Sequence, residues 1–391
     1  MKRKLLYLLL IALVAVSCTT KKANEADNDT ANVSIAAMGQ MYMLLGTYTS
    51  DEGSRGIYVY KFDTDTGESE WVSMVEVANP SYLTLSPNEQ FVYSVGENGD
   101  DDSYAHAFSF DKESGQLKLI DSQLTYGSSP AYITVDAQGY NLITANYGGG
   151  SISQFNIISD GTLSPLSNLY EFEGKGEDPT RQQQPHLHSV RYSPDGKYLF
   201  ATDLGTDKIY RYKTITSVFE GQPALLKNDS VVFATPAGTG PRHFDFHPNG
   251  LYFYLLGELS GEVIVYDYND GDLEQKQTIL ADTKGAQGSA DIHVLPNGKF
   301  LYASNRLQED GIAIFSIDKE DGSLTKVGYQ LTAKHPRNFA ITPNGKFLLV
   351  AGRDDNKVEV YRIDNKTGLL TNTNQDIAID KPVCIKFAAM N

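Results

Sequence analysis

One short phrase occurs six times along the chain, and its repetition constrains the fold more than any other feature. The copies are SPNEQFVYSV (86–95), DAQGYNLITA (136–145), SPDGKYLFAT (193–202), HPNGLYFYLL (247–256), LPNGKFLYAS (295–304) and TPNGKFLLVA (342–351). Counted from Pro87 to its counterparts, the steps are 50, 57, 54, 48 and 47 residues. A period of this length indicates one supersecondary unit that is stacked many times.

Each unit is predicted to contain four antiparallel strands. A Pro-Asn-Gly or related turn separates two short runs of alternating apolar and polar residues, which is typical of a β-hairpin. A third strand follows and ends in an acidic turn with glycine, as in EVIVYDYNDG at 262–271. A fourth strand then leads into the next unit. Four-stranded sheets repeated radially form the blades of a β-propeller.

The two ends of the repeat region predict how the ring closes. The hairpin phrase occurs six times, but the third-strand phrase occurs seven times. The segment 41–47 resembles a second strand without a first, and 382–387 resembles an innermost strand without a hairpin partner. We therefore predict an all-β, seven-bladed propeller in which strand 382–387 completes the blade begun by 41–78. An open solenoid, the alternative, would leave this strand as an unpaired edge.

The first forty residues carry signals of export. The basic start MKRK and the apolar run LLYLLLIALVAV predict a signal peptide over 1–17. The segment ends Ala-Val-Ser-Cys, similar to a bacterial lipobox, which makes Cys18 the expected lipidation site; ordinary cleavage after Ala-Val-Ser is the alternative. Residues 18–40 would form a flexible tether, and 41–391 the propeller. We expect a protein on the periplasmic side of the envelope, attached to the membrane only through this lipid.

The charge balance argues against two classes of partner. The chain has 49 acidic and 33 basic residues among 391, and its formal net charge is −16. Such a charge disfavours nucleic acid and anionic lipid, so an anionic ligand would need a local group of cations. If Cys18 carries lipid, the only other cysteine is Cys384 and no disulfide forms. We expect a monomer.

Two positions of the repeat place charged residues on one face of the propeller. The start of the innermost strand and the end of its hairpin partner lie on the same side, because the two strands are antiparallel. Six residues before the phrase proline stand Ser81, Ala131, His188, Arg242, Ala290 and Arg337, with Val383 in the closing strand. Ten residues after it stand Glu97, Tyr147, Leu204, Glu258, Arg306 and Arg353, preceded by Gly96, Asn146, Asp203, Gly257, Asn305 and Gly352. We predict a functional site on this face, with the insertion 164–187 as its lid or wall.

Two other interpretations of these residues remain open. Arg242 and Glu258 belong to adjacent strands of one blade and would pair with each other in a purely structural arrangement. The residues His186, His188 and His243 would suit a metal ion, but no tight ligand spacing supports such a site. We predict no metal and no organic cofactor.

Motifs spread over the whole repeat region resemble those of one enzyme family. They include GTYT, GIYVYKFD, ANYGGGSISQF, PHLHSVRYSPDGKYLF, GPRHFDFHPNG and ADIHVLPNGKFLYASNR. In the same order, from about residue 42 to 387, they resemble the seven-bladed β-propeller lactonases, which include propeller-type 6-phosphogluconolactonases and carboxymuconate-lactonising enzymes. The resemblance implies a catalytic set of His188 in PHLHSV, Arg242 in GPRH, Glu258 in GEL and Arg306 in SNR.

Opening a lactone requires an activated water, a stabilised oxyanion and a protonated leaving alkoxide. Glu258 or His188 would be the base and the other the acid; if Glu258 is paired with Arg242, its pKa falls and His188 becomes the better base. Arg242 would meet the oxyanion, and Arg306 with a second arginine would hold a phosphate or carboxylate. The expected substrate-binding residues are Asn146, His243, Asp291, His293, Asn305, Arg337 and Arg353.

We therefore expect a hydrolase that opens 6-phosphogluconolactone or a related sugar-acid lactone. An exported protein would not normally meet the phosphorylated compound, which favours a sugar lactone outside the cytoplasm. A non-catalytic envelope propeller that binds an anionic sugar or a protein on the same face is the alternative from another class. The reverse reaction, which closes a dicarboxylic acid to a lactone, would use the same residues.

Overall fold

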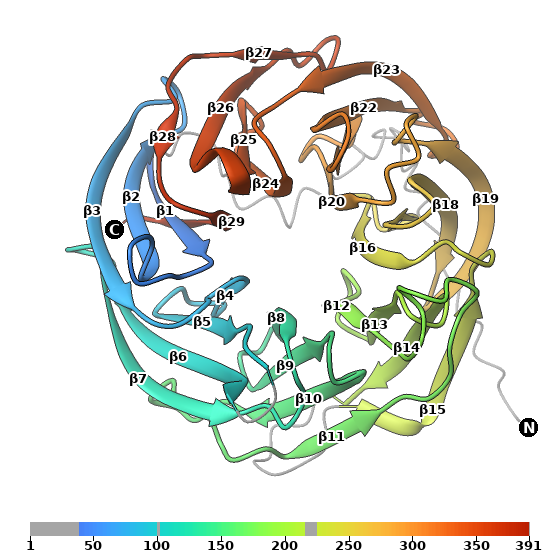
Figure 1. The fold of residues 1–391 in the computed structure, drawn as a ribbon, viewed down its shortest axis with the longest axis horizontal. Helices are drawn as coiled ribbons and strands as arrows, with labels where there is room; N and C mark the ends of the chain where they lie inside the picture. Colours follow the sequence, from blue (N-terminus) through green and yellow to red (C-terminus); the bar gives the residue numbers. More distant parts are fainter. Residues whose placement is uncertain (1–38, 100–101, 216–224, 391) are drawn as a thin grey trace, which may run out of the picture. The chain divides into compact units, whose positions relative to one another are not determined.

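A computed structural model describes residues 39–99, 102–215 and 225–390, without the side chains of 226–229. In this part of the chain the strands form seven antiparallel sheets around a ring (Figure 1). A short 3-10 turn, η2 (Arg353–Asp355), follows β25 in this part of the chain. The predicted all-β, seven-bladed propeller is confirmed. The predicted signal peptide, the lipidation at Cys18 and nearly all of the tether lie outside the described residues.

The strands follow the chain blade by blade. Blade 1 contains β29 (Pro382–Ala389), β1 (Gln40–Thr47), β2 (Gly56–Asp63) and β3 (Ser69–Glu76), and blade 2 contains β4 (Leu83–Leu85), β5 (Phe91–Gly96), β6 (Tyr104–Asp111) and β7 (Gln116–Leu124). Blade 3 contains β8 (Pro130–Val135), β9 (Asn141–Asn146), β10 (Ser151–Asn156) and β11 (Asn168–Glu171), and blade 4 contains β12 (Leu187–Tyr192), β13 (Tyr198–Asp203), β14 (Lys208–Thr214) and β15 (Leu225–Ala234). Blades 5 to 7 contain β16 (Pro241–Phe246), β17 (Tyr252–Gly257), β18 (Glu262–Asn269), β19 (Asp272–Leu280); β20 (Ser289–Val294), β21 (Phe300–Asn305), β22 (Gly311–Ile317), β23 (Leu324–Leu331); and β24 (Pro336–Ile341), β25 (Phe347–Gly352), β26 (Lys357–Ile363), β27 (Leu370–Asn372), with β28 (Ile377–Ala378) also paired to β26.

The repeated phrase forms the turn between the two innermost strands of a blade. Its glycine takes a left-handed conformation, for example with φ of 72° at Gly250 and 73° at Gly298. Glycine adopts such a φ without the steric penalty of a Cβ, which explains why the phrase keeps it. The copy at 86–95 has Glu89 there, with φ of 54°.

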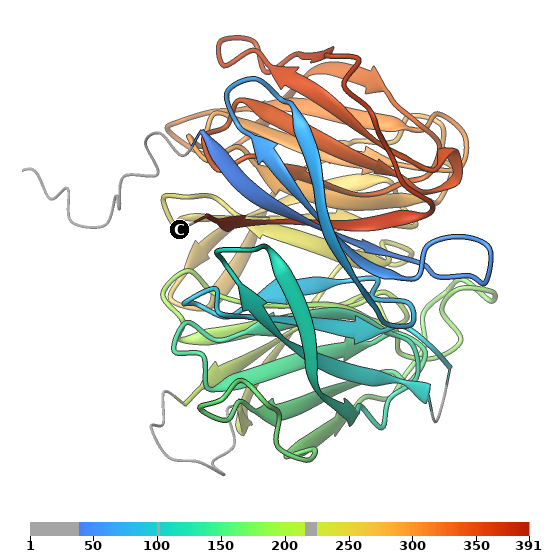
Figure 2. The same ribbon diagram turned by 90° about the vertical axis from the view of Figure 1, so that its left-hand side faces the viewer.

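The ring closes as the sequence predicts. Strand β29 pairs antiparallel with β1, from Met41 opposite Ala389 to Leu45 opposite Ile385, so the last strand is the innermost strand of the first blade. Figure 2 shows β29, in dark red, beside the blue strands of blade 1. Cys384 on this strand is a buried free thiol, and its Sγ accepts a hydrogen bond from the Leu83 amide at 3.3 Å.

Adjacent blades are joined by buried tyrosines. The hydroxyl of Tyr93 donates to the carbonyl of Gly161 at 3.2 Å, that of Tyr254 to Gly322 at 2.9 Å, and that of Tyr302 to Gly368 at 2.9 Å. Each tyrosine lies on the second strand of one blade, and each glycine ends the third-strand turn of the next. Apolar packing between sheets is thus combined with a satisfied polar group.

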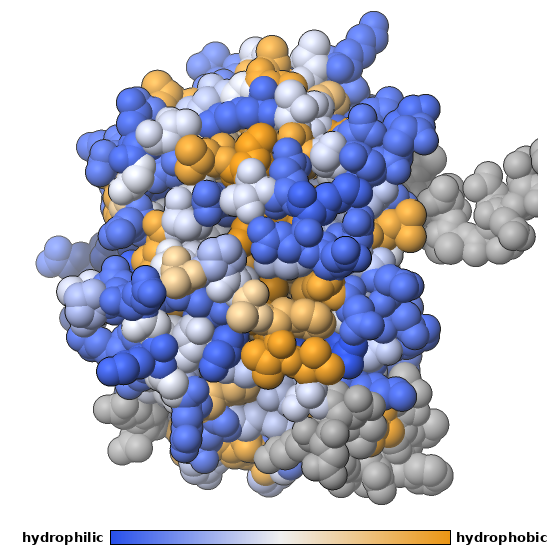
Figure 3. Space-filling model, turned by 90° about the vertical axis from the view of Figure 1, so that its right-hand side faces the viewer, coloured by the Kyte–Doolittle hydropathy of each residue, from blue (hydrophilic) through white to orange (hydrophobic). Residues whose placement is uncertain are grey.

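The outer surface carries no continuous apolar belt in the view of Figure 3, where apolar side chains form small groups among hydrophilic ones. Leu280, at the end of β19, is 49% exposed. Single exposed apolar residues of this kind are ordinary for a soluble surface. No helix within the described residues is long and apolar enough to cross a membrane.

Candidate active site

The face predicted from the repeat contains a polar pocket at the inner ends of the blades. Its volume is about 180 Å³, and it is lined by Glu97, Ala131, Tyr147, Arg181, His188, Glu258 and Arg337. Below it lies a much smaller cavity of about 10 Å³, lined by Ser81, Tyr82, Ala131, His188, Arg242, His243, Arg337, Asn338 and Val383. We call these the substrate pocket and the neck. His188 and Arg337 line both.

Irregular strand pairing directs the neck residues inward. In four innermost strands the register to the neighbouring strand shifts around one residue, which takes no regular pairing position: Ala131, His188, Arg242 and Arg337. The closing strand has the same irregularity around Val383. A bulge of this kind bends the strand and re-aims a side chain. In these five blades the innermost strand therefore presents one side chain to the neck, and the sequence decides its chemistry.

Glu258 lies at the centre of a group of arginines. Its carboxylate accepts hydrogen bonds from Arg242 Nε at 2.8 Å and Arg181 Nη2 at 2.7 Å, and Arg306 Nη2 is 3.3 Å from Oε1. Burial alone would raise the pKa of Glu258, but Arg306, Arg242 and Arg181 outweigh it and lower the pKa to about 2. Glu258 is therefore a fixed carboxylate at neutral pH, and a poor general base or acid.

The two deeper arginines are occupied with contacts of their own. Arg242 is 1% exposed, and its Nη1 donates to the carbonyl of Ala290. Arg306 donates to the carbonyl of Gly288 at 2.7 Å and lies 3.2 Å from His335 Nε2. Burial lowers the pKa of Arg306 to about 9, although Glu258 opposes this shift. Both arginines support Glu258, and neither lines the substrate pocket.

His188 is the histidine of the substrate pocket. It is 3% exposed and lies edge-on to the Tyr147 ring, with 5.4 Å between the ring centroids. Burial holds the pKa of His188 well below its usual value, and the charges of Arg242 and Arg337 lower it further. The imidazole is thus neutral at physiological pH and has a lone pair to accept a proton. Its Nδ1 is buried and has no hydrogen-bond partner in the described structure.

Arg337 forms the opposite wall of the substrate pocket. Its Nη2 lies 3.4 Å from both oxygens of Glu97, and its guanidinium carbon is 5.5 Å from the centre of the Tyr48 ring. The Tyr48 hydroxyl donates to Glu97 at 2.9 Å. The pocket is lined by two arginines and two glutamates, and two further arginines, Arg242 and Arg306, contact Glu258 from outside this lining. With these two included, the group has two more positive than negative charges on a chain of net charge −16, and an anionic ligand requires such a local cationic group.

A hydrogen-bonded row of side chains continues below the neck. His243 Nδ1 is 2.7 Å from Asp291 Oδ1, and His293 Nε2 is 3.0 Å from Asp291 Oδ2. Burial would raise the pKa of Asp291, but the two histidines keep it well below its usual value. Burial lowers the pKa of His243 to about 3, with the Arg242 charge adding to the shift and Asp291 opposing it. The pair therefore consists of a carboxylate and a neutral imidazole.

Five of the predicted binding residues line neither cavity, and three of these, Asn146, Asn305 and Arg353, have partners elsewhere. Asn146 donates to Ser151 and Ser153 within its own blade, at 3.0 and 2.8 Å. Asn305 accepts from Ser289 at 2.6 Å. Arg353 begins η2 and pairs with the adjacent Asp354 at 2.6 Å. Among the predicted binding residues, Arg337 lines both cavities, His243 lines the neck, and Asp291 and His293 lie below it.

Sequence reasoning missed Arg181. It lies in the insertion 164–187, of which β11 forms the outer strand of blade 3 while the later part lies beside the substrate pocket. Arg181 Nη2 also donates to the Tyr147 hydroxyl at 3.3 Å. The insertion has no counterpart in the other repeats, so register could not place this residue. The insertion thus contributes Arg181 to the lining of the substrate pocket.

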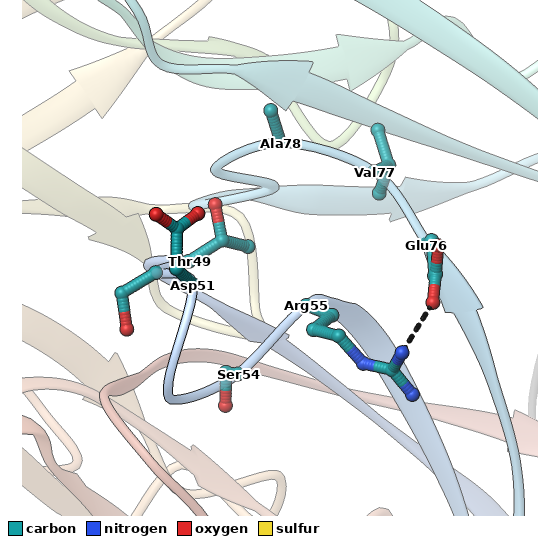
Figure 4. A pocket seen from close by; sticks show the side chains of 8 residues that line it. Thr49, Asp51, Ser54, Arg55, Glu76, Val77 and Ala78 are labelled. Carbon is teal, nitrogen blue, oxygen red and sulfur yellow. Dashed lines mark ion pairs between the residues drawn. The ribbon is translucent and has the colours of Figure 1, made fainter.

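A larger groove does not carry the chemistry. It has a volume of about 600 Å³ and is lined by Thr49, Ser50, Asp51, Ser54, Arg55, Glu76, Val77 and Ala78. Figure 4 shows Arg55 and Glu76 directed toward each other, with 2.7 Å between Nη1 and Oε1, and both side chains are mostly exposed. No histidine and no buried charged side chain lines the groove, so nothing in it is activated for catalysis.

The described residues contain no group of three or more His, Cys, Asp or Glu side chains placed to hold a metal ion. His186, one of the three histidines considered for such a site, places Nδ1 2.8 Å from the Tyr147 carbonyl and stacks on the Tyr147 ring. The imidazole of His186 therefore contacts Tyr147 and does not join His188 and His243 in a group of metal ligands.

A closed seven-bladed propeller with a polar pocket at the inner ends of its blades, lined by arginines, glutamates and a histidine, is typical of an enzyme that takes a small molecule. Comparison with known proteins specifies the family. The family described as lactonase, 7-bladed beta-propeller matches residues 42–387. The chain belongs to this family and is an enzyme of the lactonase type.

Individual relatives span nearly the whole chain. The 6-phosphogluconolactonase of Formosa agariphila is 39% identical over 344 residues, which cover 86% of this chain and 97% of that protein. A protein of known crystal structure from Bacteroides fragilis is 51% identical, with a TM-score of 0.87 over 90% of this chain and 99% of the other. The periplasmic gluconolactonase of Pseudomonas aeruginosa is 32% identical, with a TM-score of 0.83 over 90% of this chain and 100% of the other.

Proposed function

We propose that the protein hydrolyses a sugar-acid lactone, such as 6-phosphogluconolactone, and that it prefers one with an anionic group outside the lactone ring. The observation that carries this proposal is the substrate pocket, in which a neutral histidine lies beside two arginines, Arg181 and Arg337. Its volume of about 180 Å³ is below the range of about 300–1,000 Å³ that is common for drug-sized ligands, and it suits one monosaccharide. The names of the relatives support the same substrate class.

In this proposal His188 is the general base. Its accessible nitrogen takes a proton from a water while the water oxygen attacks the lactone carbonyl. The charge that develops on the carbonyl oxygen is stabilised by Arg337, which lines the same pocket. When the intermediate collapses, the bond from the carbonyl carbon to the ring oxygen breaks, and the imidazolium returns the proton to the leaving alkoxide. The products are a carboxylic acid, which ionises, and a free hydroxyl.

Glu258 has a different role from the one expected for a base or acid. Because it is an ionised carboxylate bound by three arginines, it holds Arg181 at the pocket and keeps Arg242 and Arg306 in place. Arg181 is the most exposed of the three, at 34% of its side chain. It is the arginine best placed to exchange its contact for the phosphate or carboxylate of a substrate.

Location bears on the choice of substrate. We propose that the protein is exported and anchored through Cys18, as its N-terminal sequence predicts, and that it acts outside the cytoplasm. The periplasmic gluconolactonase among its structural relatives supports this proposal. A non-phosphorylated sugar-acid lactone is then the natural substrate.

The test is a proton-release assay with 6-phosphogluconolactone, glucaro-1,4-lactone (which keeps a free carboxylate) and the neutral glucono-δ-lactone, measured against spontaneous hydrolysis. We expect catalysis well above background that is lost in His188→Gln and retained in His247→Gln. His247 is a matched control because it lies in a turn on the opposite face, where it contacts the carbonyl of Gly298. Rates equal to background on all three lactones would overturn the proposal and favour a binding propeller.

A further inference from the structure

The neck contains buried polar atoms that the described protein leaves unpaired. Ser81 Oγ, His188 Nδ1 and His243 Nε2 are buried without a hydrogen-bond partner. All three residues line the neck, and they come from blades 2, 4 and 5. An unpaired buried polar group costs about 1–3 kcal/mol, so three such atoms around one cavity indicate a bound species. The volume of about 10 Å³ is about enough for one water molecule.

The hydrogen bonds of Asp291 fix the protonation of His243. The Asp291 carboxylate can only accept, and His243 Nδ1 lies 2.7 Å from it, so the imidazole carries its proton on Nδ1. The Asn338 amide and the backbone amide of Ile292 donate to the same carboxylate, which holds it in one orientation. His243 Nε2 is therefore a lone-pair acceptor directed at the neck.

We propose that the neck binds one water molecule that connects His243 to His188. The water donates one hydrogen to His243 Nε2, and its oxygen accepts the Nδ1–H of His188, while Ser81 Oγ takes a third hydrogen bond. His188 is thereby held as the Nδ1–H tautomer, with the lone pair of Nε2 directed at the substrate pocket. This inference rests on the proposed function, in which that lone pair is the base. Asp291, His243 and Ser81 are then positioning residues that act through His188.

Charge and geometry favour water over an ion. Arg242 and Arg337 line the same cavity, and their positive charges disfavour a metal cation. A chloride ion would meet the lone pair of His243 Nε2, which repels an anion. Only a molecule that both donates and accepts hydrogen bonds satisfies all three unpaired atoms. Water has two donors and two acceptors, and it fits the available volume.

The direct test is a crystal structure of the protein at a resolution that shows ordered water. We expect one density peak within about 2.7–3.2 Å of Ser81 Oγ, His188 Nδ1 and His243 Nε2. A peak about 2.0–2.1 Å from both imidazole nitrogens would identify a metal ion instead and overturn the inference. A neck without density would also overturn it. Nitrogen-15 NMR of the histidines gives a second readout, because it distinguishes the Nδ1–H from the Nε2–H tautomer of His188.

Kinetics then tests the positioning role. We expect Asp291→Asn to lower kcat by up to about 100-fold, which is the lower end of what a general base typically contributes. KM should not change, and His188 should occur in both neutral tautomers. The matched control is Asp245→Asn, two residues after His243 on the same strand, where the carboxylate pairs with Arg191 at 2.9 Å. We expect this control to keep both kcat and the tautomer. An equal loss in both variants, or an unchanged His188 tautomer in Asp291→Asn, would refute the positioning role.

The two proposals fail in different ways. If the lactones are hydrolysed but the neck lacks its water or His188 is the Nε2–H tautomer, the inference about the neck is wrong and the proposed function stands. If the water and the tautomer are found but no lactone is hydrolysed above background, the proposed function is wrong and the neck is a structural water site.

Discussion

Replacing Glu258 by glutamine should remove a pH-dependent part of the stability. Glutamine keeps the size of the side chain but removes the charge that Arg242, Arg306 and Arg181 contact. The pKa of Glu258 is about 2 in the folded protein, against 4.5 for the unperturbed group. Each unit of pKa difference corresponds to about 1.36 kcal/mol, so the carboxylate contributes about 3 kcal/mol to the free energy of unfolding at pH 7.

The sign of the pH dependence follows from the depressed pKa. The contribution is fully present above the unfolded pKa of 4.5, and it is lost as the pH falls toward the folded pKa of about 2. At pH 3 roughly 2 kcal/mol of it should be gone, according to the same linkage relation. The difference between wild type and Glu258→Gln should therefore shrink from about 3 kcal/mol at pH 7 to about 1 kcal/mol at pH 3.

Urea unfolding followed by far-ultraviolet circular dichroism measures this difference at each pH. Glu76→Gln is the matched control, because Glu76 also pairs with an arginine but both side chains are mostly exposed. This variant should match wild type at both pH values, since exposed ion pairs contribute little. A deficit in Glu258→Gln that is the same at pH 7 and pH 3, or that is absent at pH 7, would refute the account of Glu258 as a fixed carboxylate.

Three further outcomes are expected. Arg181→Ala should raise KM by about tenfold or more for anionic lactones and less for glucono-δ-lactone, because charge-assisted bonds to the anion are lost; equal effects on both in the proton-release assay would contradict this. Gly250→Ala should destabilise the protein by about 1–2 kcal/mol in urea unfolding, because a φ of 72° is unfavourable for alanine. No atom lies within 4 Å of the added Cβ, so a clash does not contribute. Gly39→Ala, at a position without a positive φ, should be neutral. Tyr254→Phe should cost about 1–3 kcal/mol, because it leaves the buried carbonyl of Gly322 unpaired. Tyr266→Phe should be neutral or stabilising, because the buried hydroxyl of Tyr266 has no partner in the described structure. Reversed thermal shifts in the two variants would contradict the tyrosine contacts.

Much of the fold could be predicted because each blade repeats the same local chemistry. The turn phrase marked every innermost hairpin, and the unpartnered segment 382–387 identified the closing strand, which β29 confirms. Counting from the phrase also brought together the residues around the axis. Six of the seven residues at the first position line the neck; Ala290 instead provides a carbonyl to Arg242.

Three features of the site were beyond that reasoning. Side chains alternate along a strand, so Asn146 and Asn305, one residue before the second position, face into their blades. The bulges that turn one residue toward the neck in five of the blades depend on strand pairing and leave no mark in a single sequence. Arg181 belongs to an insertion without a repeat counterpart, so its contact with Glu258 depends on tertiary packing alone.

The pairing of β29 with β1 also sets an order of events for a chain that is made from its N-terminus. The first blade to leave the ribosome is the last that can be completed, because its innermost strand consists of residues 382–389. Until then β1, although buried in the finished protein, has one edge without a partner, and Val383 is absent from the neck. A chain interrupted between residues 354 and 381 thus contains every charged residue of the site but lacks the strand that completes it. Catalytic competence in this architecture therefore requires the strand at residues 382–389.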